Sequence, residues 1–366
     1  MSSSESNRSP IEGNKLQPPE TLVGLLERYS PTGQEAEAAA WLVQRMLSLG
    51  FTRAFLDPAG NAVGVLGDGP REIVLLGHID TVSGRIPVHL EDGKLYGRGS
   101  VDAKGALAAF VDAASAVGAC QGWRIVVIGA VEEEGDSRGA RFAAGQYHPE
   151  YAVIGEPSFW DRITVGYKGF ARARITVRRP PAHSASGLPT ASEEAVALWA
   201  SLSTWTAEFN KGRERAFDQL QVALRAVSSG EDDSTEWGSL QVWARLPLDF
   251  PPSSWYESVQ TLFTGRPVEF DSEGFAIPAF RGGKDNRLVS EFLRAIRAEG
   301  GEPRFVVKSG TADLNFVAPA WGCPALAYGP GDSSLDHTLG ENLPLSEYDR
   351  AVRVVSNVID RLVKAT

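Results

Sequence analysis

Histidine and carboxylate side chains recur at the ends of apolar segments in this 366-residue chain. His78 and Asp80 come directly after the apolar run EIVLLG, and residues two apart project from the same face of a strand. Comparable places are held by Asp102, Glu132, Glu133, Glu134, Glu156 and His337. Acids that gather at one place repel one another unless a cation offsets them. The pattern therefore indicates a metal site, with Asp80 orienting the ring of His78.

Each of these residues also has an ordinary explanation when it is taken alone. His78 and Asp80 could form a strand end with two solvated polar groups, and an acidic run is usually a solvated surface. Position weighs against these explanations. Every candidate follows an apolar strand or lies in a glycine-containing turn, as in GRGSVDAKG, GEP and LDHTLG.

The segments that carry the candidates alternate between strands and helices. Apolar strands that end in potential ligands are predicted over 72–80, 123–136 and 151–158. In open α/β sheets, sites form where the carboxyl ends of strands meet. Residues far apart in the sequence can therefore reach one crevice.

The pattern changes over residues 166–279. The segment GYKGFARARITVRR alternates as a half-exposed strand should, and the order strand–helix–strand–strand–helix–strand follows. This is the order of an α+β ferredoxin-like unit. We therefore expect an inserted domain at 166–279, a catalytic α/β domain of 21–165 plus 280–366, and a polar, disordered tail at 1–20.

Composition restricts the class of protein. The chain is 43% hydrophobic and 22% charged, and its net charge of −10 argues against nucleic-acid binding. No apolar run reaches the roughly 18 residues that a membrane span needs, and no hydrophobic signal segment opens the chain. Two cysteines without CxxC spacing favour a reducing, cytoplasmic setting.

The ordered motifs GHIDTV, GRGSVDAKGALAAF, VEEEGDSRGA, IGEPS and LDHT resemble those of the M20 family of metallopeptidases and deacylases. The resemblance implies an α/β fold with a zinc-exopeptidase-like mixed sheet flanked by helices. It also implies that the inserted α+β ferredoxin-like domain serves as a lid and forms a homodimer. The implied cofactor is a pair of zinc ions, for which cobalt often substitutes. By this resemblance Asp102 bridges the ions, His78 and Glu156 hold one, and Glu134 and His337 hold the other.

Further roles come from the same resemblance. Aligning the turns makes Glu133 the general base and Glu134 the ligand, although a slip by one residue within 132–134 stays open. Asp80 would accept a hydrogen bond from the free ring nitrogen of His78. His183, in RPPAHSASG, would enter the partner subunit's site and help to bind the oxyanion. The alternative is an exposed loop histidine.

The substrate is predicted less directly. VVKSGTADLNF occupies the place of the family's substrate loop, so Lys308, Gly310 and Thr311 are candidate contacts, as is Arg281, although both cations could be surface residues. GHIDTVSGRIPV, GGKDNRLV and KSGTADLNF most resemble family hydrolases that release lysine, and in some lineages ornithine, from a small acidic amino-group carrier protein. Competing hypotheses are a hydrolase of small N-acyl amino acids (an acetylornithine deacetylase, aminoacylase or carboxypeptidase) and a non-catalytic scaffold.

A row of arginines suggests a docking surface for that carrier. Alternation puts Arg172, Arg174 and Arg178 on one face of a strand, on an otherwise acidic protein. The alternative is an ordinary solvated sheet face.

Overall fold

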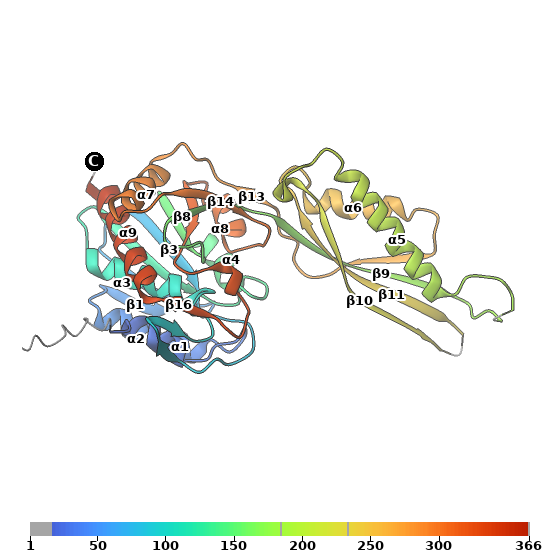
Figure 1. The fold of residues 1–366 in the computed structure, drawn as a ribbon, viewed down its shortest axis with the longest axis horizontal. Helices are drawn as coiled ribbons and strands as arrows, with labels where there is room; N and C mark the ends of the chain where they lie inside the picture. Colours follow the sequence, from blue (N-terminus) through green and yellow to red (C-terminus); the bar gives the residue numbers. More distant parts are fainter. Residues whose placement is uncertain (1–16, 184, 233, 365–366) are drawn as a thin grey trace, which may run out of the picture.

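The computed structural model describes residues 17–183, 185–232 and 234–364. Figure 1 shows a large lobe around a central sheet and a smaller, elongated lobe that carries α5 and α6. Most of the tail predicted at 1–20 lies outside the described residues, and α1 begins at Glu20. No helix within the described part of the chain is long and apolar enough to cross a membrane.

The large lobe is built on a nine-stranded mixed sheet in the order β1-β2-β6-β3-β7-β15-β8-β13, with β14 also paired to β8. Its strands β6, β3, β7 and β15 run parallel, whereas β1, β2 and β13 pair antiparallel with their neighbours. The bounds are β1 Arg53–Leu56, β2 Ala62–Leu66, β3 Arg71–His78, β6 Trp123–Ala130, β7 Tyr151–Gly155, β8 Arg162–Tyr167, β13 Phe280–Arg281, β14 Arg304–Lys308 and β15 Ala325–Tyr328. The predicted mixed α/β sheet flanked by helices is thus confirmed.

Helices cover both faces of this sheet. One layer consists of α1 Glu20–Glu27, α2 Ala36–Ser48, α3 Lys104–Val117, α7 Arg287–Ala298 and α9 Leu345–Lys364, and the other of α4 Arg138–Ala144 and α8 Leu314–Trp321. In β3, Ile73 and Leu75 belong to the first core, and Val74 and Leu76 belong to the second. Burial on both faces explains why the strand is apolar without alternation.

The small lobe has its own sheet and core. Its antiparallel sheet has the order β10-β11-β9-β12. The bounds are β9 Gly169–Arg179, α5 Ala191–Phe209, β10 Gln221–Glu231, β11 Glu236–Leu246, α6 Pro252–Leu262 and β12 Val268–Ser272. Ile175, Leu198, Val242 and Trp255 are buried in its core. The chain order is strand–helix–strand–strand–helix–strand, and this sheet order is that of a ferredoxin-like unit.

Short elements complete the fold. A small three-stranded sheet pairs β16 Asn342–Pro344 with β5 Lys94–Tyr96 and β4 His89–Glu91, and the 3-10 turns are η1 Ala216–Asp218 and η2 Ser333–Leu335. The chain passes from β8 of the large sheet to β9 of the small one at Lys168 and returns over 273–279. The two lobes are therefore joined by two adjacent connections.

Candidate metal centre

A cavity of about 670 Å³ lies between the two lobes. The large lobe contributes acids and a histidine from loops at the carboxyl ends of its strands, namely Asp102, Glu133, Glu134, Glu156, Asp336 and His337. The small lobe contributes aromatic and cationic side chains, namely Phe170, Arg172, Trp243 and Arg245. Acidic and basic walls therefore face each other across the cavity.

Asp102 lies between two histidines at the acidic wall. Its Oδ1 is 3.2 Å from Nε2 of His78, and its Oδ2 is 3.1 Å from Nε2 of His337. Nε2 of His337 is also 2.9 Å from Oε1 of Glu134. One ligand atom each from Asp102, Glu134 and His337 lies within 4.8 Å of the others. Each carboxylate oxygen of Asp102 thus faces a different imidazole, which is the arrangement that a bridging ligand requires.

Glu156 supplies an acceptor that the protein itself leaves unused. Its Oε1 is buried and has no hydrogen-bond partner among the described residues. Burial, together with nearby Asp102, raises the pKa of Glu156 to about 8. An orphaned buried carboxylate is costly unless a cation accompanies it. Imidazole and carboxylate groups are also the donors that zinc takes, so the residues present fit a metal centre at Asp102.

Both histidines lie among acids that raise their pKa values. Hydrogen bonds to Asp102 and Glu134 raise the pKa of His337 to about 10. Burial opposes protonation of His78, but contacts with Asp102 and Asp80 raise its pKa well above the usual value. A metal ion binds neutral imidazole, so loading the site would release these protons.

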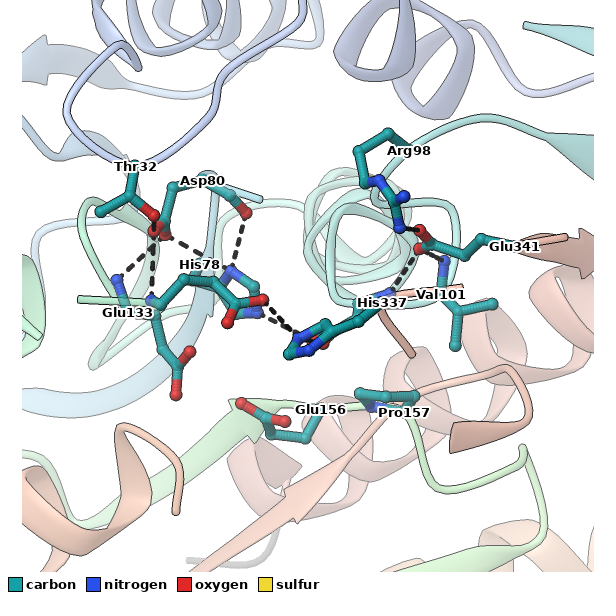
Figure 2. A network of polar contacts seen from close by, with 12 residues as sticks. Thr32, His78, Asp80, Arg98, Val101, Glu133, Glu156, Pro157, His337 and Glu341 are labelled. Atoms are coloured by element: carbon teal, nitrogen blue, oxygen red, sulfur yellow. Dashed lines mark hydrogen bonds and ion pairs between the residues drawn. The ribbon is translucent and has the colours of Figure 1, made fainter. Parts of the chain in front are cut away.

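Asp80 contacts the ring of His78 through its backbone carbonyl and, at a longer distance, through the predicted carboxylate. Nδ1 of His78 is 2.9 Å from the backbone carbonyl of Asp80, whereas the carboxylate oxygen Oδ1 is 3.5 Å away. The carboxylate accepts hydrogen bonds from the backbone N–H of Glu133 at 3.0 Å and of Glu134 at 3.1 Å. It also accepts one from the Thr32 hydroxyl at 2.9 Å (Figure 2). The side chain of Asp80 therefore fixes the two glutamates, and its backbone orients the ring.

The three consecutive glutamates differ in their surroundings. Glu132 has a left-handed backbone with φ of 60° and pairs with Arg138 at 2.8 Å. Among the described residues, Glu133 and Glu134 line the cavity and Glu132 does not. Burial, together with Glu156, raises the pKa of Glu133 well above its usual value. This geometry favours Glu133 as the proton-accepting residue and Glu134 as the ligand.

The predicted substrate contacts are only partly brought together. Lys308, Gly310 and Thr311 line the cavity, and the ammonium of Lys308 donates to the carbonyl of Pro157. Arg281 is exposed on β13, opposite Gly166, and does not belong to the described cavity lining. It pairs at the edge of the large sheet, which is why it does not reach the cavity.

His183 does not line the cavity of its own chain as far as the structure describes it. It is exposed, and its Nδ1 accepts a hydrogen bond from the Ala185 N–H. The loop between β9 and α5 that carries it lies at the end of the small lobe remote from the large sheet (Figure 1). Within one chain, His183 is therefore an exposed loop histidine.

The arginine row on β9 is largely engaged with acids. Its alternation is as predicted, because the intervening residues are buried. Arg174 pairs with Glu273 at 2.5 Å and Arg178 with Glu269 at 3.2 Å. Arg172 lines the cavity and is 3.7 Å from Asp136. Of the three arginines, only Arg172 thus presents its charge to the cavity.

Sequence reasoning missed Arg245. Its guanidinium donates to the Thr311 hydroxyl at 3.2 Å and lies 4.6 Å from the Phe170 ring centroid. Within the described ranges, no carboxylate forms an ion pair with it. The alternation of SLQVWARL could have indicated it, since Trp243 and Arg245 share a strand face.

Comparisons with known proteins show what this chain is similar to. Residues 74–361 match the model of peptidase family M20/M25/M40. A LysW-lysine hydrolase of Deinococcus radiodurans is 44% identical over 91% of this chain and 94% of the relative. A LysW-lysine/LysW-ornithine hydrolase of Saccharolobus solfataricus is 29% identical over 94% of this chain and 95% of the relative.

Solved structures share the fold. Aminopeptidase PepT from Bacillus cereus superposes with a TM-score of 0.76 at 19% identity, over 94% of this chain and 97% of that one. The YXEP protein of Bacillus subtilis, a dinuclear metal-binding M20 peptidase, has a TM-score of 0.70 at 13% identity, over 94% of this chain and 97% of that one. The chain therefore belongs to peptidase family M20/M25/M40.

Proposed function

We propose that this protein is a two-metal amidohydrolase that releases lysine, or ornithine, from the amino-group carrier protein LysW in lysine biosynthesis. The observation that best supports a hydrolase is the position of Asp102. Its two oxygens face His78 and His337 beside the buried Glu133. The choice of substrate is supported by the similarity to hydrolases named for LysW. The catalytic unit would be 21–165 plus 280–366, with 166–279 inserted into it.

The proposed ligands divide into two sets that share Asp102. His78 and Glu156 would hold one zinc ion with it, and Glu134 and His337 the other, and cobalt could take the place of zinc. When bound, such a pair supplies Lewis acidity and lowers the pKa of water. Glu133 takes the proton of the attacking water and returns it to the leaving amino group. Asp80 holds the backbone of Glu133 in place for this transfer.

Arg245 is the proposed partner of the substrate carboxylate. A released amino acid carries a free carboxylate beside the amide, and a guanidinium binds such a group with two parallel hydrogen bonds. Arg245 lies at the cavity with no acid paired to it in the described part of the chain. Lys308, Gly310 and Thr311 line the same cavity, whereas Arg281 is left out of the proposed site.

Carrier docking is proposed at the cavity mouth. Arg172 lines the cavity, and Arg225 is exposed with its guanidinium 4.4 Å from the ring centroid of Trp243, another lining residue. Such arginines would attract an acidic carrier to the site. The double variant Arg172→Ala/Arg225→Ala should raise KM for LysW-lysine and weaken its salt dependence.

The matched control replaces Arg174 and Arg178, which the glutamates of β12 and of its following loop already engage. It removes the same charge but should leave KM within about twofold, since exposed pairs contribute little. Equal effects of the two double variants would favour docking along the whole row.

A homodimer through the small lobe is also proposed. Its edge strand β10 is 11 residues long and largely exposed, with Val227 56% exposed, and an open edge can pair with a second copy. The dimer would bring His183 of the partner subunit to the oxyanion side of the cavity. Mixing His183→Ala with Glu133→Gln subunits should then restore about one quarter of wild-type activity, because half of the dimers are mixed and each has one intact site. Absence of restoration would count against a shared site.

The test of the reaction compares LysW-lysine with N-acetylornithine as substrates of the purified enzyme. Activity on LysW-lysine but not on N-acetylornithine supports the proposal. Activity on N-acetylornithine but not on LysW-lysine would assign a small-molecule hydrolase. Glu133→Gln should lower kcat by roughly 100- to 10,000-fold with unchanged metal content. Glu132→Gln is the matched control and should remain active, because Glu132 pairs with Arg138 outside the cavity. Full activity of Glu133→Gln would contradict its role.

A further inference from the structure

A buried ion pair lies behind the candidate metal centre. Nη1 of Arg98 is 2.9 Å from Oε2 of Glu341, and the two side chains are 5% and 1% exposed. Neither residue belongs to the described lining of the cavity. The pair therefore does not contact a substrate held there, and its influence on the centre must pass through other residues.

Glu341 holds the backbone of the bridging aspartate. Its Oε1 accepts hydrogen bonds from the N–H of Val101 at 2.9 Å and of Asp102 at 3.0 Å. Figure 2 shows the Glu341 carboxylate between Arg98 and Val101. Bonds to an ionised acceptor are the stronger kind, so they restrain the turn that carries Asp102.

Arg98 holds two further loops. Its Nη1 donates to the carbonyl of Thr338 at 3.0 Å, next to His337. Its Nε donates to the carbonyl of Gly84 at 2.9 Å, in the segment that follows Asp80. One guanidinium and one carboxylate therefore connect three ligand-bearing segments of the chain.

The loop of His337 needs such support. His337 has a φ of 63°, a left-handed backbone that residues other than glycine rarely adopt. A backbone of this kind persists only where its surroundings impose it. The Arg98 contact to the adjacent Thr338 carbonyl is one such restraint.

Stability alone is a poor explanation for the pair. Taking two charges out of water costs free energy that their attraction often only offsets, so a buried ion pair is weak evidence of net stabilisation. Its contacts, by contrast, go to the segments that carry Asp102 and His337.

We infer that Arg98 and Glu341 are positioning residues that set the separation of Asp102 and His337, and so the affinity of the metal site formed by Asp102, Glu134 and His337. The site that contains His78 and Glu156 is less dependent on the pair. His78 ends strand β3, and its ring bonds to the Asp80 carbonyl. Loss of the pair should thus first weaken the binding of the ion that Asp102, Glu134 and His337 would hold. This inference rests on the proposed two-metal function.

The test measures metal binding directly. Glu341→Gln keeps the size of the side chain but places an amide nitrogen against Arg98 or against the two N–H donors. Zinc per subunit is determined by elemental analysis, and affinity by calorimetric titration and by the absorption bands of Co²⁺. We expect wild type to bind two ions and Glu341→Gln to bind the second roughly 10- to 100-fold more weakly. Arg98→Lys should have an intermediate effect, because one ammonium cannot reproduce the fork of contacts.

Glu72→Gln is the matched control. Glu72 is 2% exposed and pairs with Arg124 at 2.5 Å, at the end of β3 opposite His78. This variant should lower Tm and still bind two ions with wild-type affinity.

Two outcomes distinguish failure of this inference from failure of the proposed function. If Glu341→Gln and Arg98→Lys bind both ions as wild type does and only lose Tm, the pair is merely structural. If wild type itself binds fewer than two ions, the two-metal centre is rejected. Should Glu341→Gln not fold, Arg98→Lys alone decides between these outcomes.

Discussion

Asp80 offers the sharpest test of how the site is held together. Its side chain is 0% exposed, and its carboxylate accepts two backbone N–H groups and one hydroxyl. Oδ1 receives the N–H of Glu133, and Oδ2 receives the N–H of Glu134 and the Thr32 hydroxyl. Asp80→Asn keeps the shape, but its amide nitrogen must face at least one of these N–H donors.

The expected magnitude follows from the lost bond. A hydrogen bond to a charged acceptor contributes about 1.5–3 kcal/mol, and each 1.36 kcal/mol changes a rate tenfold. If that free energy serves to hold Glu133 and Glu134, kcat of Asp80→Asn falls by roughly 10- to 200-fold. The ring of His78 keeps its contact with the Asp80 carbonyl, so this proposed ligand stays oriented.

Steady-state hydrolysis of LysW-lysine, together with Tm, provides the assay. Thr32→Val removes only the hydroxyl donor and should lower kcat less than about fivefold, because both backbone bonds remain. Asp112→Asn changes a carboxylate that accepts the hydroxyls of Thr21 and Tyr348 away from the cavity, so it should affect Tm without affecting kcat. The reasoning is refuted if Asp80→Asn keeps kcat within twofold of wild type while its Tm falls as in Asp112→Asn.

Three further outcomes are expected. Arg245→Met should raise KM for the lysine conjugate by roughly 10- to 100-fold through loss of a charged hydrogen bond, and an unchanged KM would remove Arg245 from the site. Chelation should lower Tm and added Zn²⁺ should restore it, since a ligand at about 100 times its Kd stabilises by about 2.7 kcal/mol; calorimetry would detect this, and an unchanged Tm would exclude tight metal binding. Burial lowers the pKa of Lys168 from 10.5 to about 8. The unfolded chain then binds this proton more tightly, so wild type gains stability relative to Lys168→Met as pH rises from about 8 to about 10.5; urea unfolding at both ends of that range should show the difference, and its absence would contradict the shift.

The sequence by itself determined the elements and the identity of the metal-binding candidates. The unbroken apolar run of β3 is that of a strand covered on both faces, and the alternation in β9 is that of a strand covered on one. These patterns are local, because burial repeats with the period of each element. Acids and histidines at strand ends could therefore be expected to meet before their distances were known.

Only the tertiary structure decided which partners these side chains take. Glu132 pairs with Arg138, whereas Glu133 lines the described cavity. Ion pairs engage Arg174 and Arg178, which are two of the three arginines in the predicted row. Arg98 and Glu341 are 243 positions apart and meet through loops whose course no periodicity records. Contacts of this kind depend on where whole elements pack, so residue type and spacing indicate that a centre exists but do not indicate what holds it in place.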